Sequence, residues 1–295
     1  MKRIIYSLYI DIPAKDLDNQ PPYPGDDIPK TQRTRLQFID HYDRLKQSHI
    51  WYSNSIGIDY TLFEYDSQYK NFSKWMKKTY PQINEYCIVN FYKIHLLYEL
   101  AKEYDEILYL DFDVVPMTTE NFFEVWDLQK AIAILNNNDD KNLMQRHKIK
   151  LNNIRGSNRS PTAKYWNCRA MLFEDGLDSH NDVFNTGIIG ASKDHLNKLD
   201  YWGEFDNTIE LMDYVKQDDF YPDHVLDMFG HDNETIWSYK VKTNKVDIQW
   251  LDTHWHYFYD NDYEWIPKKT KLVHTINKKF DVVWNTCESR GIIHE

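Results

Sequence analysis

A short apolar run that ends in two carboxylates constrains the fold of this chain most. Residues Ile107–Leu110 are apolar or aromatic, and Asp111-Phe112-Asp113 follows them without a break. A run of this kind is typical of a strand that is buried on both faces. Two carboxylates at the end of such a strand would be costly without a cation or hydrogen-bond donors nearby. The pattern therefore predicts a sheet edge at which charged groups are concentrated.

Strand-like and helix-like segments alternate around this run. We predict strands at Ile4–Ile12, Tyr60–Tyr65 and Ile107–Leu110, and helices at Thr31–Ile56 and Val89–Tyr104. Strands that alternate with helices usually pair in parallel within one sheet. We therefore expect an α/β fold with a mostly parallel central sheet flanked by helices. Ligands in such sheets bind beyond the carboxyl ends of the strands, where Asp111 and Asp113 would lie.

The 295 residues permit one large domain or two small ones. Since no internal repeat or linker is visible, we predict a single domain over residues 1–295 with insertions. Residues 141–169 form one candidate insertion, because they hold eight Lys or Arg and no acidic residue. We interpret this basic segment as a candidate lid over a bound anion. A solvated basic surface and a dock for an acidic acceptor are the alternatives.

Charge and hydropathy exclude several classes of protein. The net charge of −11 argues against a general binder of nucleic acid or anionic membranes. No stretch approaches the roughly 18 apolar residues that a membrane-spanning helix needs. Cys87, Cys168 and Cys287 are widely spaced and odd in number, which indicates a reducing compartment. We therefore expect a cytoplasmic protein without a transmembrane segment.

The Asp111-Phe112-Asp113 motif suits a divalent cation. Two carboxylates at i and i+2 offer hard oxygen ligands, which Mg²⁺ and Mn²⁺ prefer, and these ions commonly bridge to substrate phosphates. The alternative interpretation is a pair of turn residues at a strand end that hold no ion.

The segment from Phe91 to Asp113 resembles the one that leads to the Asp-x-Asp motif of nucleotide-sugar glycosyltransferases. It is most similar to the glycogenin-like family, glycosyltransferase family 8. Three further segments fall in that family's order, namely Phe184–Gly190, His231–Glu234 and Lys271–Lys279. The resemblance implies a Rossmann-like GT-A fold. It also implies transfer of a hexose or pentose from a UDP-sugar, with retention, to a hydroxyl group of a glycan, protein or lipid.

The resemblance also implies a set of metal ligands. Asp111 and Asp113 would hold Mn²⁺ or Mg²⁺ on the nucleotide diphosphate, and His274 would complete the metal site. Neutral imidazole is an acceptable ligand for Mn²⁺. His254 and His256, which lie in an aromatic stretch, are rival ligands.

The lysines carried over from the family are expected to contact the donor. Lys93 corresponds to the family's helix lysine, and the later lysine, which binds the diphosphate, is either Lys278 or Lys279. The family places that lysine six positions after the histidine, whereas here the two candidates follow His274 by four and five. Asn277 stands in place of the family's glycine, and Asn enters the left-handed region more readily than most residues. The remaining predicted donor-binding residues are Tyr9, Phe112 and Gly187.

Three residues are candidates for a catalytic role. Asn185 corresponds to the family's asparagine that faces the donor sugar, and its amide can both donate and accept hydrogen bonds. Asp232 or Glu234 could serve as a general base if the reaction inverted the anomeric carbon. Asp232 could equally cap a helix, and Asn233 replaces the family's glutamine.

Two other classes compete with a glycosyltransferase. The run Leu110–Val115 also resembles the Asp-x-Asp signature of haloacid-dehalogenase-type phosphatases, although that signature normally follows the first strand of the fold. The third class is a carbohydrate-binding protein without turnover on a transferase scaffold. Product analysis discriminates among the three classes. A glycosyltransferase releases or transfers sugar from a nucleotide sugar, a phosphatase releases phosphate from a phosphomonoester, and a binding protein does neither.

Overall fold

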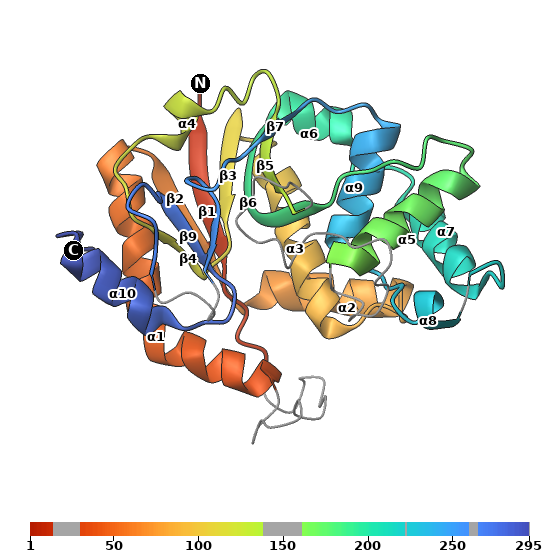
Figure 1. The fold of residues 1–295 in the computed structure, drawn as a ribbon, viewed down its shortest axis with the longest axis horizontal. Helices are drawn as coiled ribbons and strands as arrows, with labels where there is room; N and C mark the ends of the chain where they lie inside the picture. The colour runs from red at the N-terminus through yellow and green to blue at the C-terminus, as the bar shows by residue number, and fades with distance from the viewer. Residues whose placement is uncertain (14–29, 138–160, 222, 260–264, 295) are drawn as a thin grey trace.

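The computed structural model describes residues 1–13, 30–137, 161–221, 223–259 and 265–294. Within them, the central sheet has the strand order β2-β1-β3-β6-β5-β7 (Figure 1). Its strands are β1 (Arg3–Leu8), β2 (Asp59–Phe63), β3 (Glu106–Leu110), β5 (Ile132–Asn136), β6 (Phe184–Ser192) and β7 (Ile248–Trp250). The helices are α1 (Lys30–Ile56), α2 (Ser67–Thr79), α3 (Glu85–Leu100), α4 (Phe122–Val125), α5 (Pro161–Glu174), α6 (Lys193–Leu199), α7 (Phe205–Gln217), α8 (Asp223–Leu226), α9 (Asn233–Thr243) and α10 (Phe280–Ser289).

The directions of the strands confirm the predicted α/β class. Strand β1 pairs in parallel with β2 and β3, and β5 pairs in parallel with β7. Strand β6 lies between β3 and β5 and is antiparallel to both. Every strand of the central sheet except β6 therefore runs in one direction, and helices flank the sheet.

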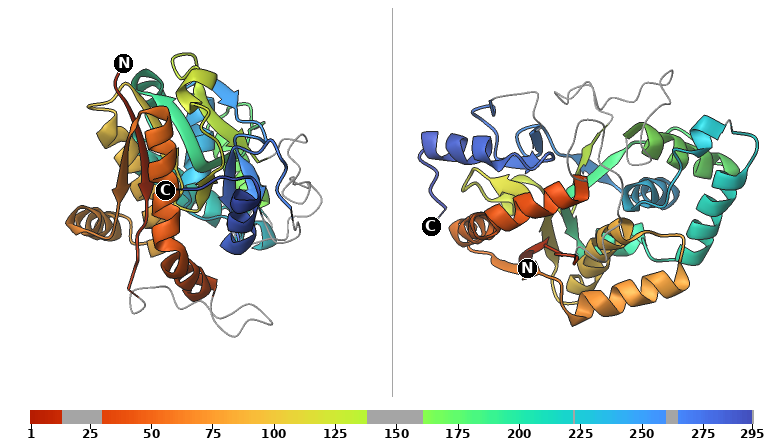
Figure 2. Two further views of the ribbon diagram at one scale, coloured as in Figure 1. Left: turned by 90° about the vertical axis from the view of Figure 1, so that its left-hand side faces the viewer. Right: turned by 90° about the horizontal axis from the view of Figure 1, so that it is seen from below.

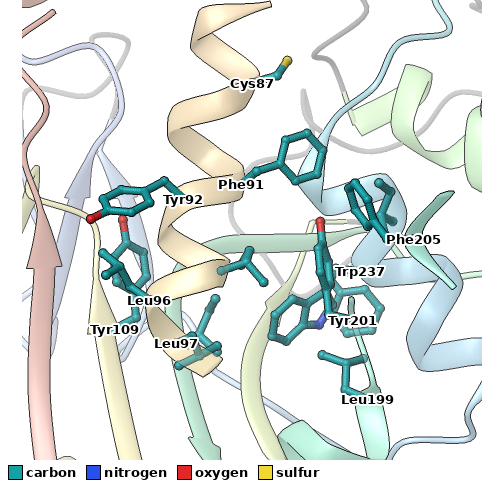
Figure 3. Packing of buried hydrophobic residues seen from close by; sticks show 14 of the residues in the cluster. Cys87, Phe91, Tyr92, Leu96, Leu97, Tyr109, Leu199, Tyr201, Phe205 and Trp237 are labelled. Atoms are coloured by element: carbon teal, nitrogen blue, oxygen red, sulfur yellow. The ribbon is translucent and has the colours of Figure 1, made fainter. Parts of the chain in front are cut away.

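Alternate residues of the central strands face opposite sides of the sheet, as strand geometry requires. Tyr6 and Tyr109 lie in the larger core, which also contains apolar residues of α2, α3, α6, α7 and α9. Ile5 and Leu108 lie in the core on the other face, with residues of α1 and α4. Helix α3 is buried on several sides, and Phe91 extends from it toward Phe205 (Figure 3), with 5.7 Å between the ring centroids. This packing fixes α3 against the sheet.

Several predicted boundaries are shifted for local reasons. The predicted strand Ile4–Ile12 ends at Leu8, where its neighbour β2 also ends, so the later residues lack a partner strand. The predicted helix Val89–Tyr104 begins earlier, at Glu85, because the side chain of Asn84 caps it by accepting a hydrogen bond from the Cys87 amide.

A second sheet has the order β4-β9-β8, and its residues Val114 and Leu272 share a core with Leu108 of the central sheet. It consists of β4 (Val114–Pro116), β8 (Tyr257–Tyr259) and β9 (Leu272–Thr275), and its core also includes residues of α1 and α10. Figure 2 shows α1 and α10 together at one end of the molecule and α5 and α7 at the other. Because β4 follows Asp113 and pairs with β9, residues 111–113 connect the two sheets.

The basic segment predicted over residues 141–169 falls partly outside the described residues, which exclude 138–160. Its last part, from Pro161, is not a loop but the start of α5, with Ala163 and Cys168 fully buried. Cys87, Cys168 and Cys287 are all buried and free of disulfide bonds. No helix in the described part of the chain combines the length and apolar character needed to cross a membrane.

Candidate active site

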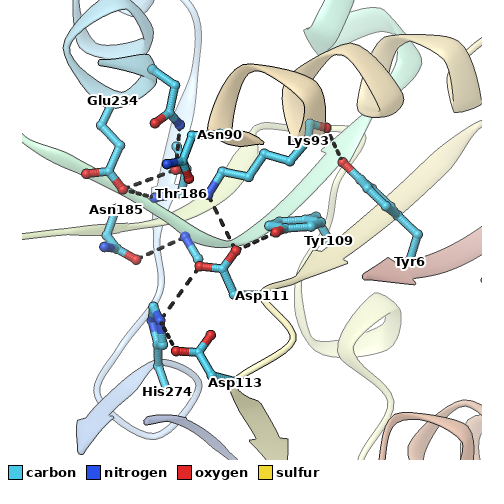
Figure 4. Close-up of polar contacts among 12 residues, drawn as sticks. Tyr6, Asn90, Lys93, Tyr109, Asp111, Asp113, Asn185, Thr186, Glu234 and His274 are labelled. Atoms are coloured by element: carbon cyan, nitrogen blue, oxygen red, sulfur yellow. Dashed lines mark hydrogen bonds and ion pairs between the residues drawn. The ribbon is translucent and has the colours of Figure 1, made fainter. Parts of the chain in front are cut away.

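Asp111 and Asp113 lie at the carboxyl end of β3, where the chain passes from the central sheet to the second one (Figure 4). The amide of Asp111 donates to the Gly187 carbonyl at 2.7 Å, so Asp111 remains attached to β6. The amide of Val114 donates to the Asp111 carbonyl at 2.9 Å and closes a turn. The Asp113 carbonyl accepts from the Thr275 amide at 3.0 Å. Backbone contacts to both sheets therefore fix the two carboxylates.

Two side chains from the central core contact Asp111. The Tyr109 hydroxyl donates to Oδ1 of Asp111, and Nζ of Lys93 lies 3.5 Å from the same oxygen. Lys93 is only 3% exposed, and its carbonyl accepts a hydrogen bond from the Tyr6 hydroxyl at 2.7 Å. Burial and the adjacent Asp111 raise the pKa of the Tyr109 phenol, which remains a donor. Lys93 is thus directed into the site and does not lie on an exposed face of α3.

His274 completes a group of three metal-ligand side chains. It pairs with Val114 across β9 and β4, which places its ring beside Asp113. Its Nε2 lies 3.4 Å from Oδ2 of Asp113 and 3.7 Å from Oδ2 of Asp111. One possible ligand atom from each residue lies within 4.8 Å of the others, and no second group of this kind occurs in the described residues. Two carboxylates and one imidazole suit Mn²⁺ or Mg²⁺.

The Lys278 ammonium pairs with Asp113. Asp113 is only 4% exposed. Its burial would raise the pKa of its carboxyl, but Lys278 and His274 outweigh this and hold the pKa well below its ordinary range. Lys278 also donates to the Ile276 carbonyl at 3.2 Å. Lys279, the other predicted lysine, is exposed at the start of α10. The geometry therefore favours Lys278 as the lysine of the site.

The turn that carries Lys278 differs from the expected one. The left-handed residue is Lys278 itself, with φ of 59°, whereas Asn277 is not among the residues with positive φ. Asn277, which stands in place of the family's glycine, therefore does not use the left-handed region. The Lys278 amide donates to the Thr275 carbonyl at 3.0 Å and so closes a tight turn over residues 275–278. Strain of this kind is tolerated where surrounding contacts hold a functional side chain.

Gly187 is required by the His274 ring. A Cβ built on Gly187 would lie 2.7 Å from Nδ1 of His274, closer than atoms can approach. The register between β5 and β6 also shifts here, because Leu135 pairs with Asn185 and the preceding Ile134 pairs with Ile189. Such irregularities redirect side chains next to active sites. Asn185 itself accepts a hydrogen bond from the Gly187 amide at 3.0 Å.

The two rival histidines are not part of the metal-ligand group. His254 is partly exposed, and its Nδ1 lies 3.5 Å from Oδ2 of Asp252. His256 is fully buried behind His274, and burial, followed by the proximity of His274, lowers the pKa of its imidazole. Of the three histidines, only His274 faces both carboxylates.

Tyr9 and Phe112 lie beside the site but pack into the core of the second sheet. Phe112 is 3% exposed, and its ring centroid lies 5.1 Å from that of Tyr9. A contact of Phe112 with a donor would therefore involve its backbone. Burial raises the pKa of Tyr9 to about 12.

Asp232 and Glu234 are both engaged in hydrogen bonds. Asp232 caps α9, accepting from the amides of Glu234 and Thr235 at 2.9 and 3.0 Å. Oε1 of Glu234 accepts from the Thr186 amide at 2.7 Å, and Oε2 pairs with Lys164 (Figure 4 shows the Thr186 contacts). These contacts join α5, α9 and β6 directly beside Asn185. Both carboxylates therefore have a structural role.

Replacing Glu234 by Gln should destabilise the protein by about 3 kcal/mol, because the change leaves the Lys164 ammonium, whose side chain is 14% exposed, without its partner. Burial would raise the pKa of Glu234, but Lys164 and Lys93 lower it overall. The stabilisation should therefore be complete above the ordinary glutamate pKa and disappear as the pH falls through the lowered value. Urea unfolding between pH 7 and pH 3 measures both effects.

The matched control is Glu103→Gln, which removes an exposed carboxylate 3.7 Å from Lys2. This change should not alter the free energy of unfolding measurably. Equal unfolding free energies for the wild type and Glu234→Gln would show that the buried pair does not hold α5 to α9.

Sequence reasoning missed Tyr109, Lys164 and Thr186. Tyr109 could have been found, because it lies two residues before Asp111 on the same face of a predicted strand. Thr186 lies between the predicted residues Asn185 and Gly187. Lys164 gave no local signal, since its partner Glu234 lies 70 positions later.

Comparison with known proteins adds a family match. A family model described as "Glycosyl transferase family 8" matches residues 19–280. No curated protein matches the chain.

Several solved structures are similar to this one. The galactosyltransferase LgtC, in complex with donor and acceptor sugar analogs, is 11% identical with a TM-score of 0.47, and the alignment covers 99% of this chain and 100% of that one. A glycosyltransferase involved in glycosylation of the major capsid of PBCV-1 is 11% identical with a TM-score of 0.40, over 94% and 95% of the two chains. Mouse xyloside xylosyltransferase 1 is 12% identical with a TM-score of 0.40, over 74% and 76%.

Proposed function

Because this chain belongs to glycosyl transferase family 8 and is a glycosyltransferase, we propose that it uses a divalent cation to transfer a sugar from a UDP-sugar to a hydroxyl acceptor. The observation that carries the proposal is the convergence of Asp111, Asp113 and His274 within 4.8 Å at the carboxyl end of β3. Substrates of open α/β sheets bind at this edge. The acceptor class is a glycan, protein or lipid that presents a hydroxyl group.

Asp111, Asp113 and His274 would hold Mn²⁺ or Mg²⁺. The chemistry that such a cation supplies is neutralisation of the negative charge on the diphosphate as the bond to the sugar breaks. Lys93 and Tyr109 hold Oδ1 of Asp111, which leaves Oδ2 directed toward His274. Lys278, which pairs with Asp113, would add a second positive charge to the leaving group.

The engagement of Asp232 and Glu234 supports retention at the anomeric carbon. A general base for inversion needs a carboxylate oxygen free to accept a proton from the acceptor. Oδ1 of Asp232 accepts two backbone amides and Oδ2 accepts from the Thr235 hydroxyl at 2.5 Å, while Lys164 and Thr186 occupy Glu234. Asn185 remains the candidate for contact with the donor sugar. Asn185 carries the one side-chain amide of β6 (Phe184–Ser192) and lies two residues before Gly187.

A nucleotide-sugar panel tests the proposal. A true UDP-sugar donor at about 100 times its dissociation constant should stabilise the protein by about 2.7 kcal/mol, or about 5 °C in melting temperature, only when Mn²⁺ is present. The donor identified this way should then yield transferred or free sugar. Stabilisation that is equal with and without Mn²⁺ would contradict the proposed metal dependence, and stabilisation by no UDP-sugar would contradict the proposed donor class.

A further inference from the structure

His256 is a buried imidazole in the segment that enters β8. It is 0% exposed. The backbone around it is fixed, because Trp255 packs in the core on one face of the central sheet and Tyr257 in the core of the second sheet. The His256 amide also donates to the Asp252 carbonyl at 2.9 Å. His256 therefore has little freedom to move.

The His256 ring makes its hydrogen bond to His274. Its Nε2 lies 3.0 Å from Nδ1 of His274, and the ring centroids are 5.2 Å apart. Within the described part of the chain, Nδ1 of His256 has no hydrogen-bond partner. Contact with His274 is therefore the polar interaction that this buried ring makes.

The His274 ring is confined on its remaining sides. Gly187 leaves room for it on β6, and the Phe258 ring lies 5.3 Å away from it, centroid to centroid. With Nδ1 directed to His256, Nε2 faces Asp111 and Asp113. One nitrogen of the ring thus faces the protein and the other faces the carboxylates.

This arrangement determines which ring nitrogen of His274 carries the proton. A neutral imidazole carries one proton, and a nitrogen that binds a metal must be the unprotonated one. If Nε2 of His274 binds the cation, its Nδ1 carries the proton and donates to Nε2 of His256. A hydrogen bond of this kind orients a ligand histidine and raises its basicity.

We propose that His256 is a positioning residue for the metal site, which acts by accepting the Nδ1 proton of His274 and so presents Nε2 of His274 to the cation. The proposal rests on the proposed function, because it requires that Asp111, Asp113 and His274 bind a divalent cation.

The test uses two substitutions and Mn²⁺ alone as the probe. His256→Phe keeps a planar ring but removes the acceptor, whereas His256→Gln keeps an amide oxygen near the position of Nε2. Titration of free Mn²⁺ by electron paramagnetic resonance should show affinity lowered about 10–100-fold in His256→Phe, with partial recovery in His256→Gln. Because Mn²⁺ is paramagnetic and broadens the signals of its ligands, nitrogen-15 spectra of histidine-labelled protein are recorded with Mg²⁺ in its place, and they should show His274 of the loaded wild type protonated at Nδ1. His254→Phe, at the partly exposed histidine, is the matched control and should bind Mn²⁺ like the wild type.

Each outcome separates the two proposals. Mn²⁺ binding that is unchanged in His256→Phe would overturn the positioning role and leave the metal site intact. Equal losses in the Phe and Gln variants would also overturn it, since ring packing and not the acceptor would then matter. Failure of the wild type to bind Mn²⁺ would overturn the metal site and the positioning role with it.

Discussion

Replacing Asp113 by Asn should lower both Mn²⁺-dependent donor binding and the transfer rate by at least about 100-fold, because a neutral amide is a poorer ligand for a hard cation. A cation at a developing diphosphate charge contributes several kcal/mol, and each 1.4 kcal/mol corresponds to a factor of about ten. The backbone of Asp113 should stay in place, since its carbonyl accepts from the Thr275 amide independently of the side chain. Calorimetry with the donor and Mn²⁺, together with product assays, measures the two losses.

Asp127→Asn is the matched control for this change. Asp127 is an exposed carboxylate 3.1 Å from Lys130. The Asp127→Asn variant should bind the donor and transfer the sugar as the wild type does. Undiminished Mn²⁺-dependent binding by Asp113→Asn would mean that the cation does not bind at the end of β3.

Replacing Lys278 by Met should strengthen Mn²⁺ binding and lower the transfer rate. The Lys278 ammonium pairs with Asp113, so a cation binding there must compete with it. Without that charge, Mn²⁺ alone should bind roughly tenfold more tightly. The transfer rate should nevertheless fall roughly 10²–10³-fold, because the diphosphate loses a positive partner as the bond breaks. Mn²⁺ titration without nucleotide and steady-state assays with the donor measure the two effects.

Lys279→Met controls for the loss of one positive charge in the same turn. Lys279 is exposed, so the change should affect neither quantity strongly. Weaker Mn²⁺ binding in Lys278→Met would contradict the competition between the ammonium and the cation. A larger loss of transfer in Lys279→Met would identify that lysine as the one that contacts the diphosphate.

The sequence predicted the centre of the site because its signals are local. An apolar run followed directly by Asp111 and Asp113 predicts a buried strand whose end carries two carboxylates, and no other part of the chain is needed for this prediction. The family resemblance added His274, which the structure places 3.4 Å from Asp113. The resemblance also added Lys93, which reaches Asp111 because α3 packs on β3.

Other features depend on contacts between distant segments. The strands of the second sheet are only three or four residues long, too short for a periodic pattern, yet they bring His274 beside Val114. Gly187 also has a role that no local pattern indicates, because it makes room for the His274 ring. His256 was predicted only as a rival ligand, because its hydrogen bond to His274 crosses 18 positions of the chain.

Pulsed electron paramagnetic resonance of Mn²⁺ bound to the protein with a UDP-sugar tests the central claim most directly. If Asp111, Asp113 and His274 hold the cation against the diphosphate, the spectrum should show coupling to a histidine nitrogen and to phosphorus. His274→Ala should remove the nitrogen coupling, and His254→Ala should keep it. Nitrogen coupling that persists in His274→Ala, or the absence of phosphorus coupling in the wild type, would contradict the proposed site.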